Sequence, residues 1–144
     1  MSGPADPIRV VIDTNVLISA LLSPGRVPDL VLGVIRRRRD VVLYDQRILA
    51  EYRSVLVRPK FSFPPERVEA LASSLLAVGR DVGAIEPWPG GLLDGTDRMF
   101  VEVAIAGEAE VLVTGNVKHY PRQAGFDVMG PTALLGLLEA CTPP

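Results

Sequence analysis

Cysteine is almost absent from this sequence of 144 residues, since Cys141 is the single example. A disulfide within the chain is therefore excluded, and we expect Cys141 to be a small apolar side chain on the last helix. No run of about 18 apolar residues occurs, so no membrane-spanning helix is expected. Residues 1–7 do not combine a basic segment with an apolar run, as a signal peptide would. These absences favour a cytoplasmic protein with no membrane partner.

An excess of charge of either sign is also lacking. The chain has 15 basic and 17 acidic residues, which gives a formal net charge of −2. This balance provides no overall attraction to nucleic acid, so a polyanion would bind through a local basic patch or a bound cation. The composition, 48% hydrophobic and 22% charged, argues against a disordered chain. At this length we expect a single domain over residues 1–144.

Short apolar runs alternate with segments of helical periodicity along the chain. The apolar runs predict strands at residues 8–12, 41–44, 82–85, 111–113 and 126–129. The periodic segments predict helices at residues 15–22, 29–37, 47–57, 66–78, 97–106 and 131–138. Strands that alternate with helices form right-handed βαβ crossovers. We therefore expect an α/β fold in which helices cover both faces of a parallel sheet.

Several acidic residues lie where this fold would place a site. Asp13 directly follows the first predicted strand, and ligands in open parallel sheets bind beyond the carboxyl ends of the strands. Asp97 begins a predicted helix, and Glu51 lies within another. Each has a simpler explanation, because Asp13, Asp97 and the nearby Asp94 can cap helices, while Glu51 can be a surface residue. If the acids converge, their repulsion calls for a cation such as Mg²⁺ or Mn²⁺, which prefers oxygen ligands.

The sequence around the first acid resembles the opening of PIN-domain proteins. The string VVIDTNVLISALLSPGRVPDLV has Asp13, Thr14 and Asn15 in the position of the family's Asp-Thr-Asn motif. Thr14 can donate a hydrogen bond to Asp13 or to a scissile phosphate, and Asn15 can orient Asp13. The alternative is that both residues simply begin a helix. The resemblance extends over about residues 10–131, which is nearly the whole chain.

Two further strings carry the resemblance. ILAEYRSVLVRPKF resembles the central helix of the family, with Glu51 as its acidic ligand, and LLDGTDRMFVEVAIAGEAEVLVTGNVKHYP resembles the third motif, with Asp97 at the helix start. Thr114 ends the fourth strand and is a candidate contact for a ligand water. Many relatives have an acid where this chain has Asn116, whose amide can ligate a metal but cannot act as a base. Asp94 can compensate from the neighbouring loop, and the departure favours one well-held ion over two.

The resemblance implies a three-layer α/β/α sandwich with a five-stranded parallel sheet. It also implies that Asp13, Glu51 and Asp97 bind Mg²⁺ or Mn²⁺ and act in the hydrolysis of RNA phosphodiester bonds. The greatest similarity is to the toxins of toxin–antitoxin systems, the VapC-type endoribonucleases. An antitoxin helix or a second copy of the chain would then cover any apolar surface that the core leaves exposed, although core packing alone also explains these apolar residues.

Basic residues form a second candidate feature. A run of arginines at the end of the second predicted helix can form a path for the RNA backbone together with Arg53, Arg58 and Lys60, or can be a solvated surface that complements the helix dipole. Lys118 can separately contact a phosphate of the RNA. His119, beside Lys118, can be a general acid, although an exposed loop histidine is the simpler interpretation. The run consists of Arg36, Arg37, Arg38 and Arg39.

Two other functions compete with the endoribonuclease. A catalytically weak RNA-binding protein of the same fold is motivated by Asn116. A phosphatase of the haloacid-dehalogenase type also places an aspartate after its first strand, but it requires a second aspartate where this chain has Asn15. The sequence therefore predicts a metal-dependent endoribonuclease, with the RNA-binding protein as the alternative.

Overall fold

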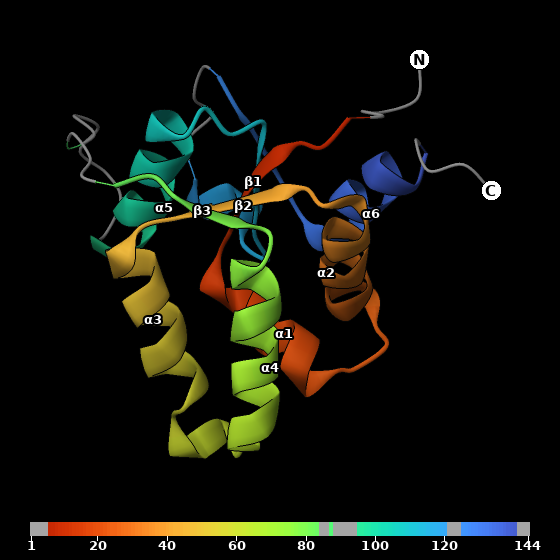
Figure 1. The fold of residues 1–144 in the computed structure, drawn as a ribbon, viewed down its shortest axis with the longest axis vertical. Helices are drawn as coiled ribbons and strands as arrows, with labels where there is room; N and C mark the ends of the chain where they lie inside the picture. The colour runs from red at the N-terminus through yellow and green to blue at the C-terminus, as the bar shows by residue number, and fades with distance from the viewer. Residues whose placement is uncertain (1–5, 84–86, 88–94, 121–124, 141–144) are drawn as a thin grey trace.

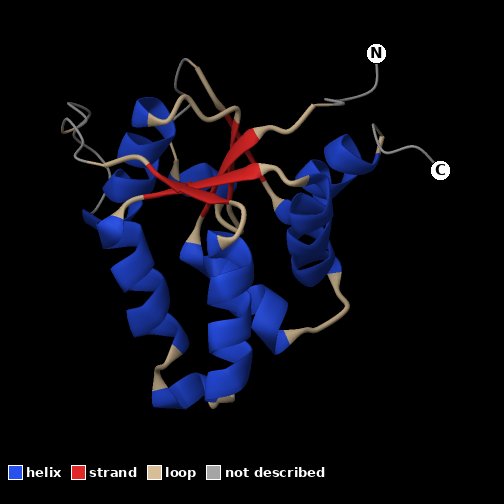
Figure 2. Cartoon of the chain, in the orientation of Figure 1, coloured by secondary structure: helices blue, strands red, loops and turns tan. Residues whose placement is uncertain are grey.

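The sheet is the element that positions the candidate site. The structure is a computed structural model, and it describes residues 6–83, 87, 95–120 and 125–140. Five strands lie in the order β3-β2-β1-β4-β5, and each neighbouring pair is parallel (Figures 1 and 2). The chain order reverses between β1 and β4, which is where ligands bind in open sheets of this kind. The strands are β1 (Arg9–Ile12), β2 (Val41–Tyr44), β3 (Gly79–Asp81), β4 (Val111–Val113) and β5 (Asp127–Met129).

Helices pack around this sheet. Helix α5 packs on β1, β2 and β4, whereas α1 packs on α2, and α2 packs on α6. Helices α3 and α4 lie side by side below the sheet in Figure 1, joined through the short 3-10 helix η1 (Pro59–Phe61). The expected α/β fold with a five-stranded parallel sheet is confirmed. The helices in the described ranges are α1 (Thr14–Leu22), α2 (Val27–Arg38), α3 (Gln46–Leu56), α4 (Pro65–Leu76), α5 (Gly95–Ala106) and α6 (Pro131–Glu139).

The two central strands form the middle of the core. Val10, Val11 and Ile12 of β1 are fully buried, as are Leu112 and Val113 of β4. A strand covered on both faces has no solvent side, so its sequence is apolar throughout instead of alternating. This is why the predicted limits of the second and fourth strands match the structure, and why the first differs by one residue.

The third strand differs from the prediction. The structure places β3 at Gly79–Asp81 and not at residues 82–85, of which the last two lie outside the described part. The strand ends at Asp81 because its carboxylate accepts the N–H of Gly83 at 2.9 Å, in a turn where Gly83 has a φ of 78°. Gly79 is required for close packing, since a Cβ there would lie 2.8 Å from the Tyr44 ring. An edge strand of this composition has no apolar run to detect.

A buried ion pair secures the amino edge of the sheet. Asp40, just before β2, is 0% exposed and accepts hydrogen bonds from the Ile8 N–H at 2.9 Å and the Arg38 Nε at 3.0 Å. Arg38 also donates to the Asp6 carbonyl at 3.0 Å. Arg39 then ends α2 in the left-handed region, at a φ of 60°. The end of α2 and the start of β1 are thereby joined.

The helices are short compared with a membrane span. Within the described ranges, no single helix is long and apolar enough to cross a membrane. Helices α1 and α2 reach the length and hydropathy of a membrane span only when they are taken together, and the chain bends by 112° between them.

Candidate metal and active site

Asp13 lies at the carboxyl edge of the sheet, between β1 and α1. Its N–H donates to the Val113 carbonyl at 3.0 Å, which continues the pairing of β1 with β4. Its extended backbone and its side-chain contact with the Asn15 N–H, at 3.4 Å, make it the N-cap of α1. Capping and a position at the sheet edge are therefore two consequences of the same location. The side chain is 8% exposed.

Neutral donors surround one oxygen of this carboxylate. Asp13 Oδ2 accepts hydrogen bonds from the hydroxyls of Thr114 and Tyr120, each at 2.8 Å, and a longer contact from the Asn15 amide at 3.4 Å. Among the residues that the structure describes, no lysine, arginine or histidine forms an ion pair with Asp13. The negative charge is oriented by dipoles but is not neutralised.

Of the auxiliary residues predicted from the sequence, Asn15 and Thr114 contact Asp13, and Asn116 contacts Thr114. The Asn15 amide also contacts the Thr114 hydroxyl at 3.4 Å, and its oxygen accepts the Gly115 N–H at 2.9 Å. Thr114 is fully buried, and its hydroxyl accepts the Asn116 N–H at 3.0 Å. Residue Asn116 itself is exposed. This network fixes the orientation of Asp13 through the start of α1 and the segment that follows β4.

Tyr120 connects Asp13 with Asp97. Its hydroxyl oxygen lies 2.8 Å from Asp13 Oδ2 and 3.4 Å from Asp97 Oδ1, so the two carboxylates approach one phenol. Burial, followed by the charges of Asp13 and Asp97, raises the pKa of Tyr120 above its ordinary value. The phenol therefore remains a proton donor. We did not predict Tyr120 from the sequence, because it follows the 3-10 helix η2 (Val117–His119) with no periodic pattern around it.

A second buried tyrosine joins α3 to the end of β1. The Tyr52 hydroxyl donates to the Ile12 carbonyl, immediately before Asp13. Burial, and then the charge of Asp13, raises the pKa of Tyr52. Tyr52 is next to Glu51 in the sequence, so this bond holds the Glu51 helix against the site. The sequence indicated only an apolar helix face at this position.

The three predicted acids do not form one tight cluster. Asp97 lies in the first turn of α5, as expected, and Glu51 is half-buried on α3. In the parts of the chain that the structure describes, no three His, Cys, Asp or Glu side chains are close enough to hold one metal ion. Asp94, the predicted accessory acid, lies outside the described residues. The structure therefore pairs Asp13 with Asp97, and the role of Glu51 stays a prediction.

An ion network that the sequence did not reveal links α3 with α5. Arg47 contacts the Glu102 carboxylate at 2.7 Å and the Asp45 carboxylate at 2.8 Å. Burial alone would lower the pKa of Arg47, but the hydrogen bonds to Glu102 and Asp45 outweigh it and raise the pKa. Asp45 is also the N-cap of α3, because it accepts the Ile48 N–H at 3.0 Å. The network ties together the helices that carry Glu51 and Asp97.

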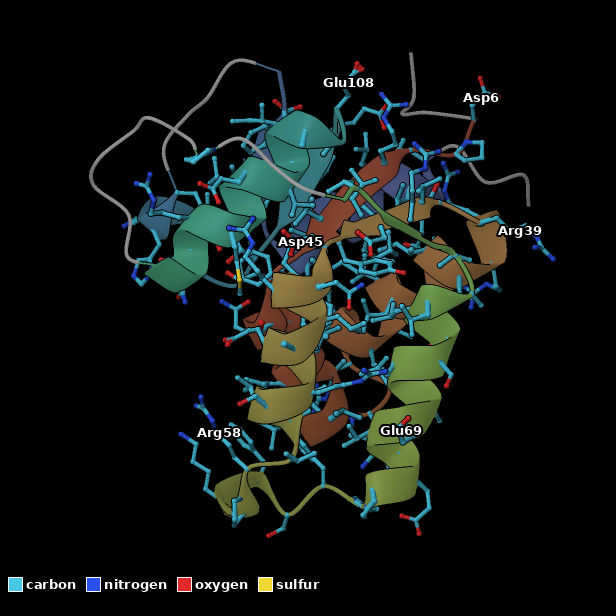
Figure 3. All side chains as sticks on the ribbon, turned by 60° about the vertical axis from the view of Figure 1, so that its left-hand side comes forward. Asp6, Arg39, Asp45, Arg58, Glu69 and Glu108 are labelled. Carbon is cyan, nitrogen blue, oxygen red and sulfur yellow. The ribbon has the colours of Figure 1, made fainter. Side chains whose placement is uncertain are left out.

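The arginine run lies at the opposite edge of the sheet. It precedes β2, whereas the site follows β1 and β4, and Figure 3 shows Arg39 and Asp45 at opposite ends of β2. Arg38 is bound within the fold by Asp40, so it is a structural residue. Arg36, Arg37 and Arg39 are exposed, and a role in RNA binding stays a prediction for them.

Lys118 lies much nearer to the site. It lines a groove of about 600 Å³ between η2 and β5, together with Tyr120 and Met129. Both Lys118 and His119 are exposed, as expected for loop residues. A polyanion in this groove would meet the Lys118 ammonium and the Asp127 carboxylate beside Tyr120, whose hydroxyl contacts both Asp13 and Asp97.

Comparison with known proteins places this geometry in a family. The sequence model of the family described as PIN domain matches residues 9–118. The match covers well over half of the chain and includes Asp13, Glu51, Asp97 and Asn116. No curated protein matches the sequence significantly. The chain therefore belongs to the PIN domain family, whose members are typically nucleases.

Proposed function

We propose that this PIN domain is a Mg²⁺- or Mn²⁺-dependent endoribonuclease and the toxin of a toxin–antitoxin pair. The observation that carries the nuclease proposal is the pairing of Asp13 and Asp97 at the edge where β1 and β4 end. PIN domains generally use divalent metals, and two carboxylates supplemented by water are a usual donor set for Mg²⁺.

The residues at this edge fit a hydrated divalent cation. Asp13 and Asp97 supply hard oxygen ligands, and the partners of Asp13 in the described residues supply no positive charge. The hydroxyl of Thr14, the residue after Asp13, is buried and has no hydrogen-bond partner among the described residues. A buried hydroxyl without a partner is costly, and water around a cation is one source of a partner. Asp13 and Asp97 would hold the ion, with Glu51 as the third acid predicted from the family resemblance.

The protein's own groups would orient the reaction. Thr114 and Asn15 hold the Asp13 carboxylate in one rotamer, which avoids the cost of ordering it during the reaction. Lys118 would contact a substrate phosphate from the adjacent groove. A bound divalent ion supplies charge neutralisation at the phosphate and acidifies water. In the hydrolysis, a water oxygen bonds to phosphorus, the bond from phosphorus to the leaving ribose oxygen breaks, and that oxygen takes up a proton.

The nuclease proposal is tested by cleavage of a panel of single-stranded and structured RNAs with MgCl₂ or MnCl₂. We expect cleavage that EDTA abolishes and that Asp13→Asn removes. A control variant, Glu139→Gln, changes an exposed carboxylate on α6 and should cleave like wild type. Cleavage by Asp13→Asn at the wild-type rate would show that this edge is not the active site.

The toxin role rests on the resemblance of the three motif strings to VapC-type toxins. The partners it implies are an antitoxin protein and a second copy of the chain. Induced expression of the wild-type chain should arrest bacterial growth, and expression of Asp13→Asn should not. Equal growth of both cultures, despite confirmed RNA cleavage by the wild type in vitro, would separate the nuclease from the toxin role.

A second candidate function is RNA binding without efficient cleavage. It is favoured by Asn116, an exposed amide where many relatives have an acid, and by the lack of a three-acid cluster in the described ranges. An RNA-binding titration beside the cleavage assay distinguishes the two functions. Tight binding without turnover at any Mn²⁺ concentration would favour this candidate.

A further inference from the structure

Tyr120 occupies a position that no other donor to Asp13 shares. Thr114 and Asn15 also donate to Asp13 Oδ2, but among the described contacts of these three side chains, that of Tyr120 is the one that also reaches Asp97. The phenol oxygen lies between the two carboxylates, 2.8 Å from one and 3.4 Å from the other. It is thus placed where a ligand shared by both acids would have to compete with it.

One hydroxyl hydrogen cannot satisfy two carboxylates. The shorter contact identifies Asp13 as the acceptor of the hydrogen, so the phenol directs only a lone pair toward Asp97. A hydrogen bond to a charged acceptor is among the stronger ones in proteins. The bond from Tyr120 therefore stabilises Asp13 when no cation is present, while the hydroxyl supplies no positive charge to either carboxylate.

We propose that the Tyr120 hydroxyl acts as a placeholder that lowers the affinity of the Asp13–Asp97 pair for a divalent cation. This inference rests on the proposed metal site. A cation neutralises Asp13 and weakens the bond from Tyr120, so binding forfeits part of the stabilisation that the phenol gave to the cation-free state. Loss of the hydroxyl does not release Asp13, because Thr114 and Asn15 still hold the same oxygen.

A positioning role for Tyr120 would act in the opposite direction. Residues that orient a metal ligand increase affinity, and their removal typically weakens metal binding about 10-fold to 100-fold. The sign of the change in metal affinity when the Tyr120 hydroxyl is removed therefore distinguishes a placeholder from a positioning residue. We expect Tyr120→Phe to bind Mn²⁺ about tenfold more tightly than wild type, the size expected for one charged hydrogen bond.

Tyr52→Phe is the matched control. It also removes a buried tyrosine hydroxyl near Asp13, but that hydroxyl donates to the Ile12 backbone carbonyl and not to a carboxylate. Calorimetric titration with MnCl₂ alone should show tighter binding for Tyr120→Phe and unchanged binding for Tyr52→Phe. In thermal unfolding, Tyr120→Phe should lower Tm more without MnCl₂ than with it, while Tyr52→Phe should lower Tm equally in both conditions.

The outcomes separate this inference from the proposed function. If wild type binds Mn²⁺ and Tyr120→Phe binds equally or less tightly, the placeholder is wrong and the metal site stands. If neither protein binds Mn²⁺, both proposals are overturned. If Tyr120→Phe does not fold, MgCl₂ added to wild type and to Tyr52→Phe should still produce a tyrosine difference spectrum, since Tyr120 loses part of its bond to Asp13. No spectral change under saturating MgCl₂ would contradict the placeholder.

Discussion

Two buried aspartates lie at opposite edges of the same sheet and are treated differently by the fold. Asp40, at the amino edge, accepts hydrogen bonds from the Arg38 guanidinium and from a backbone N–H. Asp13, at the carboxyl edge, accepts hydrogen bonds from two hydroxyls and approaches a second acid, Asp97, through Tyr120. One charge is neutralised within the fold, and the other is only oriented.

The difference indicates which carboxylate is available for chemistry. A buried charge that has its own counterion is a structural element, and breaking the pair destabilises the fold. A buried charge held by neutral donors and near another negative charge is costly unless a cation arrives. We therefore expect substitution by asparagine to reduce activity at Asp13 and to reduce the free energy of unfolding at Asp40.

The largest expected effect is the loss of activity in Asp13→Asn. We expect RNA cleavage with MgCl₂ to fall by about 1000-fold or more, because the variant removes charge where the transition state needs a cation. The unfolding free energy should change little, since the loss of repulsion from Asp97 offsets the weaker hydrogen bonds from Thr114 and Tyr120. Cleavage kinetics and urea unfolding measure the two effects. A clear loss of stability would mean that Asp13 is a structural residue like Asp40.

The second expected effect is the converse in Asp40→Asn. Loss of the buried charge breaks the ion pair between Asp40 and Arg38, which should cost about 3 kcal/mol of unfolding free energy. Cleavage per folded molecule should be unchanged, because Asp40 lies at the other edge of the sheet. Urea unfolding with Glu139→Gln, an exposed carboxylate on α6, as control tests this. Equal stability of Asp40→Asn and the control would remove the contrast between the two edges.

A smaller effect is expected at a neutral donor. Thr114→Val removes a 2.8 Å hydrogen bond to Asp13 with little change in shape. We expect Mn²⁺ to bind about tenfold more weakly, since this hydroxyl, unlike that of Tyr120, contacts Asp13 but not Asp97 in the described contacts. Titration with MnCl₂ measures the change, and Thr132→Val on the exposed side of α6 is the control. Tighter binding by Thr114→Val would show that all donors to Asp13 compete with the ion.

The smallest effect is a loss of stability at alkaline pH. The pKa of folded Tyr52 is raised above its ordinary value of 10.0, so the unfolded chain releases this proton first. The stability that follows from the raised pKa is therefore complete below about pH 10 and declines as the pH rises above it. Urea unfolding across this range should show a shallower decline for Tyr52→Phe than for wild type. Identical declines would mean that Tyr52 contributes nothing to it.

Much of the fold could be predicted from local patterns. Strands whose residues are all apolar are detected as short apolar runs, so the fully buried β4 and the largely buried β2 had the predicted limits. The polar edge strand β3 was misplaced because its position depends on pairing with β2 and on the turn at Gly83. Asp13 and Thr114 could be assigned to one edge, because parallel strands end together.

The sequence alone determined that this protein is an α/β domain with Asp13 at the carboxyl edge of a parallel sheet, since hydrophobic periodicity and chain order are local properties. Only the tertiary structure decided which charges are neutralised. It paired Arg38 with Asp40, placed Arg47 between Asp45 and Glu102, and brought Tyr120 between Asp13 and Asp97. Arg38 and Asp40, like Arg47 and Asp45, are two residues apart in the chain. The contacts of Arg47 with Glu102 and of Tyr120 with Asp13 and Asp97 instead join distant residues, which strand order and helix packing bring together, so spacing along the chain could not reveal them.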